Sequence, residues 1–437
     1  MMRAVKAAAV AGLCALLAGP APARDRSPFG RDVRGSLGVN IHFTDPQPGE
    51  MDMLADSGMR WVRMDLAWGA TERQKGVYDF SHYDTLMDNL RRKGMKALLI
   101  LDYGNDIYGP GGKPPYDDEG RAAFARWAVA AVDHFQGKDV LWELWNEPNG
   151  AWFWPNPSSA DYSKLALTVD KAIREKFPKE RLIGPATSGI DLGFLEGCFK
   201  AGCLQYWDAV SVHPYRQDEP ENAIPEYVKL RDLIARYAPP GKKIPILAAE
   251  WGYSVGWNNF TDERQGIYLA REFLANIENG IPLTIWYDWH DDGSNPKDAE
   301  HNFGMTHNET HAGAKPLYDP KPAYTACRTL TTILDGYGFD SAVTPGREDA
   351  STRLTVTPGD GRKDHVLKFR RGDNRRFAAW TESETPHVTI IPMRRGDYTV
   401  VDWLGKTFRH MRADRLGLSL EIGDHPQYII PGTRDRL

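Results

Sequence analysis

The sequence has few cysteines, no long apolar run and no excess of basic residues. Its 437 residues include four cysteines, and their spacing matches no zinc-binding pattern. The apolar run from 7 to 18 is too short to cross a bilayer and no later run is longer, so no membrane span is expected. The net charge of −5 at pH 7 gives the chain no general attraction to nucleic acid.

The first residues are typical of a secretory signal. Arg3 and Lys6 precede the apolar run, and Ala21-Pro22-Ala23 supplies a small-residue cleavage site. We therefore predict a signal peptide at 1–23 and a periplasmic or secreted protein. In an oxidising compartment Cys198 and Cys203 are close enough in sequence to form a disulfide, which we predict, whereas Cys327 has the setting of a buried thiol.

Short apolar runs alternate with amphipathic stretches over most of the chain. The predicted strands are 37–43, 60–66, 97–102, 141–145, 182–185, 209–213, 246–249 and 282–287, and the main predicted helices are 83–93, 121–135, 163–176, 223–237, 264–279 and 324–334. Alternation predicts a parallel sheet, and eight repeats predict an α/β fold closed into a (β/α)8 TIM barrel over 24–337. An open doubly wound sheet is the structural alternative.

A different pattern begins after residue 335. Short strand-like runs at 352–356, 365–369, 376–380, 388–391, 398–401 and 428–430 are separated by Gly-Asp and similar turn signals. We predict a C-terminal β-sandwich accessory domain at 338–437. Six arginines flank its turns and are interpreted as solvated loop charges, with an acidic-glycan contact as the alternative: Arg370, Arg371, Arg375, Arg376, Arg394 and Arg395.

Two glutamates stand at the ends of predicted strands. Glu147 follows the fourth strand in Trp145-Asn146-Glu147-Pro148, where proline ends the strand, and Glu250 ends the seventh. The C-terminal ends of barrel strands build the active-site face, and a pair of carboxyl groups there can hydrolyse a glycosidic bond. The alternatives are a turn residue for Glu147 and a salt-bridged strand end for Glu250.

These motifs resemble those of glycoside hydrolase clan A. The segment Trp61-Val62-Arg63-Met64-Asp65, His213-Pro214-Tyr215 and Glu250-Trp251-Gly252 are similar to the second-, sixth- and seventh-strand motifs of families 39 and 5. The resemblance runs from about residue 37 to the C-terminus. It is closest to family 39-like enzymes of the PslG type, which act on bacterial exopolysaccharides.

The resemblance implies a retaining mechanism, with Glu147 as acid and base and Glu250 as nucleophile. It also implies groups around them: Asn146 on the sugar 2-hydroxyl, Tyr215 beside the nucleophile, and His213 and Arg63 beneath it. For the last three, a structural place at the barrel top is the alternative.

Tryptophans near strand ends are candidate sugar contacts, because indole packs on the apolar C–H face of a sugar. By resemblance to the strand-eight tryptophan of the clan we predict contact through Trp286, followed by a cis peptide bond, and further contacts through Trp152, Trp154 and Trp289. Core packing is the alternative for each. The loop from His290-Asp291-Asp292, with Asp298, Glu300 and His301 downstream, has a metal site as its alternative, but a mixture of carboxylates and imidazoles selects neither calcium nor zinc well. We therefore predict a solvated loop that grips substrate.

The sequence thus predicts a monomeric retaining glycoside hydrolase that needs no metal or cofactor and cleaves a polysaccharide or oligosaccharide by double displacement, as an endoglycosidase on exopolysaccharide. A β-xylosidase and a family 5-type β-glucanase are alternatives that differ in substrate. A catalytically inactive polysaccharide-binding barrel is the alternative outside enzymes, although such a protein would be expected to have lost one of the two glutamates.

Overall fold

The computed structural model describes residues 29, 32–109, 111–308, 319–348, 354–355 and 363–432. The predicted signal peptide at 1–23 lies outside the described residues, as does part of the strand expected at 352–356. Within the described ranges no helix is long and apolar enough to cross a membrane.

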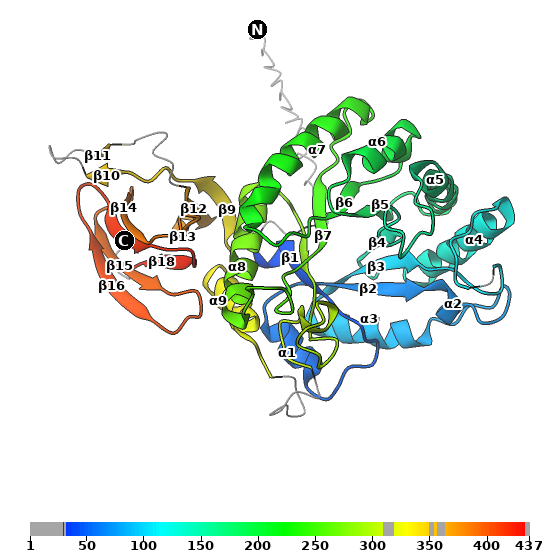
Figure 1. The fold of residues 1–437 in the computed structure, drawn as a ribbon, viewed down its shortest axis with the longest axis horizontal. Coiled ribbons are helices and arrows are strands. Elements are labelled where there is room, and N and C mark those ends of the chain that lie inside the picture. Colours follow the sequence, from blue (N-terminus) through cyan, green and yellow to red (C-terminus); the bar gives the residue numbers. More distant parts are fainter. Residues whose placement is uncertain are drawn as a thin grey trace, which may run out of the picture.

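Eight parallel strands close into a barrel in chain order, which confirms the predicted TIM barrel (Figure 1). The strands are β1 Leu37–Asn40, β2 Trp61–Ala67, β3 Lys96–Asp102, β4 Val140–Leu144, β5 Arg181–Ser188, β6 Ala209–His213, β7 Ile246–Trp251 and β8 Thr284–Trp286. The helices around them are α1 Glu50–Asp56, α2 Trp68–Thr71, α3 Ser81–Lys93, α4 Asp118–His134, α5 Ser159–Lys176, α6 Leu192–Lys200, α7 Ile224–Tyr237, α8 Asp262–Glu278 and α9 Pro322–Ile333.

Side-chain alternation along the strands separates two cores. Leu98 and Ile100 of β3 point into the barrel and pack with Leu141 and Leu247, whereas Leu99 belongs to the core between strands and helices. Towards the C-terminal ends of the strands the inward positions become polar. The barrel interior is therefore filled by apolar side chains below and carries charged groups at its upper end.

Antiparallel strands form a sandwich-like domain after the barrel. A six-stranded sheet in the order β16-β15-β18-β13-β12-β9 and a two-stranded sheet β14-β17 enclose a small apolar core. The bounds are β9 Gly338–Ala342, β12 Asp364–Arg371, β13 Asn374–Thr381, β14 His387–Ile391, β15 Gly396–Val401, β16 Phe408–Ala413, β17 Leu418–Ile422 and β18 Gln427–Pro431, and a separate pair is β10 Arg347–Glu348 with β11 Leu354–Thr355.

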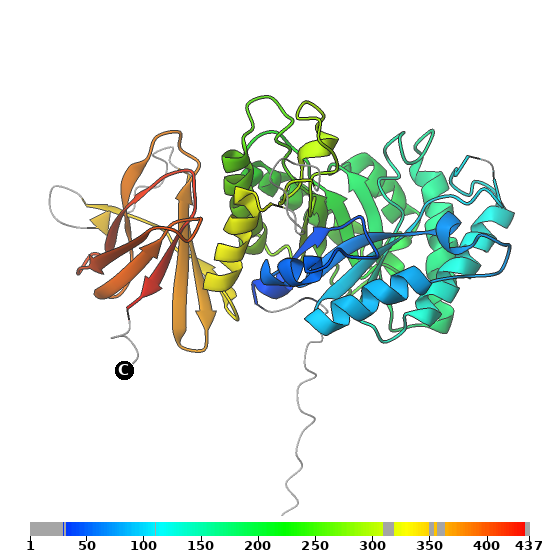
Figure 2. The same cartoon turned by 90° about the horizontal axis from the view of Figure 1, so that it is seen from below.

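The other face of the six-stranded sheet packs on the barrel. Leu367, Trp380 and Tyr428 belong to the same apolar core as the barrel helices, and Trp380 Nε1 donates to Glu221 Oε1 at 2.8 Å. Figure 2 shows the sheets lying against α9, the yellow helix. The two parts therefore share one continuous core.

Candidate active site

Glu147 and Glu250 meet at the C-terminal end of the barrel. A carboxylate oxygen of each lies within 4.8 Å of the other. Glu250 lies near the end of β7, and Glu147 follows β4 with a left-handed backbone, φ 46°. The N–H of Glu147 donates to the carbonyl of Ala186 at 3.0 Å, which ties the β4 loop to β5. A left-handed backbone conformation is uncommon at residues other than glycine, and such residues concentrate at functional sites.

Arg63 of β2 connects the residues beneath the two glutamates. Its Nε donates to Glu143 Oε2 at 2.7 Å and its Nη2 to Asn146 Oδ1 at 2.7 Å, while its Nη1 donates to Glu250 Oε2. Arg63 and Glu143 are both buried. A rigid guanidinium can hold three acceptors at fixed angles, so Arg63 orients Glu250 and Asn146 together.

His213 ends β6 and Tyr215 follows it, and both residues contact the glutamates. The Tyr215 hydroxyl donates to Glu250 Oε1 at 2.9 Å. His213 Nδ1 lies 2.9 Å from Glu147 Oε1 and 3.9 Å from Glu250 Oε1. Burial by itself raises the pKa of Glu250, but His213, Arg63 and the Tyr215 hydroxyl outweigh it and hold this pKa below its usual value. The arrangement favours an ionised Glu250.

An ion pair that sequence reasoning missed borders the site. His42, just after β1, lies 3.2 Å from Asp288. Burial lowers the pKa of His42, but Asp288 raises it further, to about 9, and burial raises the pKa of Asp288 to about 7. The Tyr287 ring packs edge-on against the rings of His42 and Tyr215, with centroid distances of 5.6 and 6.5 Å. A signal was present, because His42 and Tyr287 continue the inward positions of β1 and β8.

A second pair of acids, Asp65 and Asp102, was also not predicted. Asp65 of β2 and Asp102 at the end of β3 lie close enough that each shifts the pKa of the other. Burial, chiefly, raises the pKa of both, and the charge of Asp65 raises that of Asp102 further. Two carboxyl groups this close disfavour each other's ionised form, although Arg63 beside them opposes this effect.

The predicted tryptophan contacts are largely wrong. Trp154, Trp286 and Trp289 are 0–1% exposed, so they present no face to a sugar. Trp286 packs against Tyr253, and Trp289 donates to Glu50. The cis peptide bond follows Tyr287, not Trp286. The reason is strand alternation: Ile285 points inward, so Trp286 points to the helices and Tyr287 inward again.

Trp152 alone among the four is exposed, at 95%, on the loop that follows Glu147. Its contact with substrate stays a prediction. Tyr103, Tyr215 and Tyr287 are half-buried aromatic side chains close to the acids, and they are better placed than Trp154, Trp286 and Trp289 to line a sugar site.

The loop after β8 was predicted to be solvated, but part of it is buried. Asp291 is 5% exposed and accepts hydrogen bonds from Lys321 Nζ and the Gly304 N–H, both at 2.9 Å. It anchors the loop to the barrel instead of reaching substrate. Residues 309–314 of this loop lie outside the described residues.

Two groups of side chains in the described part bring possible metal ligands within 4.8 Å: His42, Asp288 and Asp292, and Glu147, His213 and Glu250. The second group is the pair of glutamates with its bridging histidine. In the first, His42 already compensates the charge of Asp288. Ion pairs and hydrogen bonds among these side chains therefore account for both clusters.

The predicted disulfide is wrong. Cys198, near the end of α6, and Cys203, in the 3-10 turn Cys203–Gln205, are both free and 0% exposed. Burial raises the pKa of Cys203 to about 12 and that of Cys198 well above its usual value. The two thiols serve as small apolar groups of the helix-side core. Cys327 is likewise a buried free thiol, as predicted.

Comparison with known proteins identifies the family. Residues 29–293 match the family model described as cellulase (glycosyl hydrolase family 5). The chain belongs to this family of glycoside hydrolases. This confirms the predicted resemblance to clan A.

Relatives of known structure or name agree at the level of the clan. A family 39 glycoside hydrolase from Bacteroides cellulosilyticus WH2 superposes with a TM-score of 0.75 and 25% identity, covering 92% of this chain and 82% of that one. A β-xylosidase from Geobacillus stearothermophilus is 25% identical over 171 residues, 35% of this chain and 34% of that protein. A β-xylosidase from Caldicellulosiruptor saccharolyticus is 25% identical over 222 residues, 44% of this chain and 45% of that protein. This glycoside hydrolase thus matches less than half the length of either xylosidase, and a PslG-type specificity stays a prediction.

Proposed function

We propose that the chain is a retaining glycoside hydrolase in which Glu250 is the nucleophile and Glu147 the acid and base. The observation that carries this is the closeness of the two carboxylates, because one oxygen of Glu147 lies within 4.8 Å of one oxygen of Glu250. Retaining enzymes keep their carboxyl groups about 5–5.5 Å apart, whereas inverting enzymes leave about 6.5–9.5 Å for a water molecule. A nearest-oxygen contact this short supports the retaining arrangement.

The environment of Glu250 supports its assigned role. Arg63 and Tyr215 hold Glu250 as an anion, and an anion can attack the anomeric carbon and form a covalent glycosyl ester. Glu147 gives its proton to the leaving oxygen. As a carboxylate it then takes a proton from the incoming water, which breaks the ester and restores both glutamates.

Substitution of each glutamate tests the roles. We expect Glu250→Gln to abolish turnover, and Glu147→Gln to lower kcat by about 10²–10⁴-fold on substrates with a poor leaving group. Aryl glycosides with a good leaving group need little acid assistance, so Glu147→Gln should still form the glycosyl ester with them, and azide, which needs no base, should restore turnover. Glu175→Gln, an exposed change on α5, is the matched control.

Product stereochemistry provides an independent check. Nuclear magnetic resonance of the first product should show the anomeric configuration of the substrate, and a 2-fluoro glycoside should label Glu250 in peptide mass spectra. An inverted product, or a label on another residue, would contradict the mechanism.

The substrate is proposed to be a polysaccharide or oligosaccharide, with an endoglycosidase of bacterial exopolysaccharide as the first candidate. A β-xylosidase is the second candidate, because relatives with partial coverage carry that name. A panel of exopolysaccharides and of aryl β-xylosides distinguishes the two. Export to the periplasm or outside the cell, and action as a monomer, are parts of the same proposal.

A further inference from the structure

The six-stranded sheet of the β-domain carries a basic pocket. It has a volume of about 690 Å³, within the roughly 300–1,000 Å³ range of small-molecule sites. The turn between β12 and β13, the β14–β15 connection and the end of β18 form its walls. Its lining includes five cationic side chains and one carboxylate: Lys368, Arg371, Arg375, Arg376, Arg394 and Asp373.

Two of the arginines are fixed by the barrel. The Arg376 guanidinium donates to the carbonyl of Ile333, and Arg371 Nη1 donates to the carbonyl of Asp335 at 3.1 Å. Both guanidinium groups also lie over the ring of Tyr337, at 4.6 and 4.9 Å from its centroid. They cap the C-terminal end of α9 with one nitrogen each, so their other N–H groups are held in place at no further cost in side-chain entropy.

Two other arginines have no anionic partner. Arg375 and Arg394 make no ion pair or side-chain hydrogen bond with any residue that the structure describes. The lining carboxylate of Asp373 faces Arg370 at 4.0 Å, and Lys368 pairs with Asp340 at 2.8 Å. The pocket therefore concentrates uncompensated positive charge in a chain whose net charge is −5, and it should attract anions.

The remaining wall of the pocket is apolar. Pro392, Met393 and Pro431 line it beside the Tyr398 ring. Tyr398 is 4% exposed, and its hydroxyl donates to the carbonyl of Arg394 at 2.7 Å, which fixes the β14–β15 connection. A ligand that carries carboxylates on a ring with C–H faces fits both walls, since guanidinium groups bind carboxylates in pairs of hydrogen bonds.

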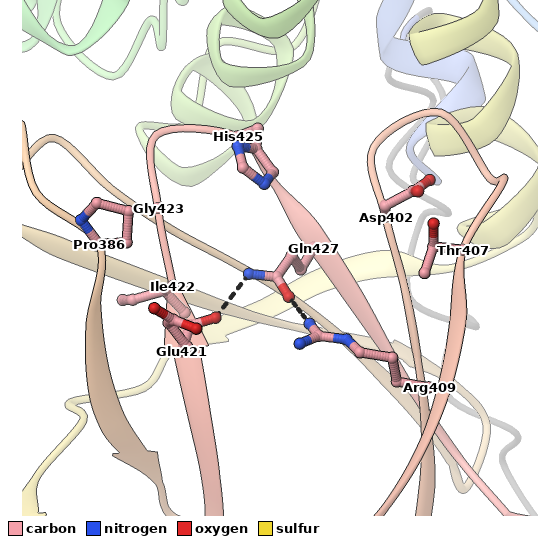
Figure 3. Close-up of a pocket in the computed structure, with 9 residues that line it drawn as sticks. All are labelled: Pro386, Asp402, Thr407, Arg409, Glu421, Ile422, Gly423, His425 and Gln427. Atoms are coloured by element: carbon pink, nitrogen blue, oxygen red, sulfur yellow. Dashed lines mark hydrogen bonds between the residues drawn. The ribbon is translucent and has the colours of Figure 1, made fainter.

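A second hollow of the same domain lacks these properties. In Figure 3, Arg409 is drawn with its hydrogen bond to Gln427, and Gln427 with its hydrogen bond to the Glu421 carbonyl. Asp402, Glu421 and His425 also line it. Its polar groups are mixed in sign and bind one another, so this second hollow favours no one class of ligand.

We propose that the basic pocket binds a carboxylate-bearing, uronic acid segment of a polysaccharide and so anchors an acidic glycan on the β-domain. The preference for an anion follows from the pocket alone. The preference for a saccharide rests also on the proposed function of the barrel.

Calorimetric titration of the full chain with oligogalacturonates tests the proposal. We expect binding that weakens steeply as the salt concentration rises from about 0.05 to about 0.5 M. The double substitution Arg375→Ala and Arg394→Ala should weaken it by about 10- to 100-fold, because both side chains lack partners and their loss leaves the fold intact. The matched control is Arg412→Ala, which removes one exposed charge from β16 outside the pocket.

Further arms of the titration identify the ligand class. Neutral xylo-oligosaccharides should not bind at the pocket. No binding of oligogalacturonate, equal binding by the double variant, or tighter binding of single-stranded DNA would overturn the proposal. The same titration on Glu250→Gln should give unchanged affinity, so a failure of the catalytic proposal leaves this one standing, and the reverse.

Discussion

At the scale of single residues, one guanidinium sets the charge balance of the active site. Arg63 is buried with Glu143 and at the same time reaches Asn146 and Glu250. Removing one member of a buried ion pair leaves an unpaired charge and costs about 3–5 kcal/mol. The Tyr215 hydroxyl, in contrast, donates one hydrogen bond, to Glu250 Oε1. Substitution of Arg63 should therefore affect both stability and catalysis, whereas substitution of Tyr215 should affect catalysis alone.

Tyr215→Phe should lower kcat without unfolding the protein. It removes one hydrogen bond to an anion, worth about 1.5–3 kcal/mol, and so about 10- to 150-fold in rate if the whole effect falls on the transition state. Because the hydroxyl also lowers the pKa of Glu250, the acidic limb of the pH–rate profile should move to higher pH. Kinetics over pH and thermal unfolding measure the two effects.

Arg63→Met is the comparison for Tyr215→Phe. It should lower both activity and the free energy of unfolding, since it leaves Glu143 buried without its cation. If Arg63→Met unfolds at the same temperature as the native chain, or if Tyr215→Phe leaves the acidic limb in place, the assigned contacts are not those that matter.

The sequence predicts residues at this scale unevenly. The positions of Glu147, Glu250, Arg63, His213 and Tyr215 follow from strand ends and from family motifs, and the structure brings all five together. The prediction for the strand-eight tryptophan failed because an error of one residue at a strand end exchanges the two faces of the strand. In the structure Trp286 lies in the core and Tyr287 lies at the site. His42 and Asp288 lie far apart in the sequence, after the neighbouring strands β1 and β8, so alternation marks His42 as inward-facing but does not reveal its partner.

At the scale of elements, periodicity predicted the long helices and the barrel strands to within a few residues. It missed α6, which is only nine residues long, and β16, whose side chains are mostly exposed at the sheet edge. A short helix and an exposed edge strand leave little periodic signal. It also missed that Cys198 and Cys203 are packed rather than cross-linked.

Contacts between β12 and the barrel predict a pH dependence of stability. His365 lies 3.4 Å from Glu278 of α8 and 2.9 Å from Glu382. Burial lowers the pKa of His365, but hydrogen bonds to these carboxylates outweigh it and raise the pKa to about 9. A pKa above the unfolded value of 6.5 means that the stabilisation is complete below about pH 6.5 and is lost as the pH rises through about 9.

His365→Gln should remove this pH dependence. The native chain should lose about 3 kcal/mol of unfolding free energy between pH 6.5 and 9 from this group, and the variant should lose less by that amount. Urea unfolding at several pH values measures it. The control His82→Gln changes an imidazole that is 70% exposed. Parallel pH curves for the native chain and His365→Gln would show that the imidazolium does not hold β12 to α8.

At the scale of the whole molecule, the barrel and the β-domain should unfold as one unit. Trp403 of the β-domain packs against Gly266 of α8, where an added Cβ would lie 2.8 Å from its ring and 2.9 Å from the backbone nitrogen of Ala323 in α9. Trp380 reaches Glu221, which Arg271 of α8 also binds through both carboxylate oxygens. A disturbance at α8 is therefore felt on both sides of the interface.

Gly266→Val tests this unity. The branched side chain has no space between α8, α9 and Trp403, and overpacking of this kind costs about 1–3 kcal/mol, or a few degrees in Tm. Heating followed by activity assays reports on the barrel, and limited proteolysis of the β-sheets reports on the β-domain. We expect both midpoints to fall together, while Gly109→Ala, where an added Cβ meets nothing within 4 Å, leaves both unchanged. Two separate transitions, with only one of them moved by Gly266→Val, would mean that the shared core does not couple the barrel to the β-domain.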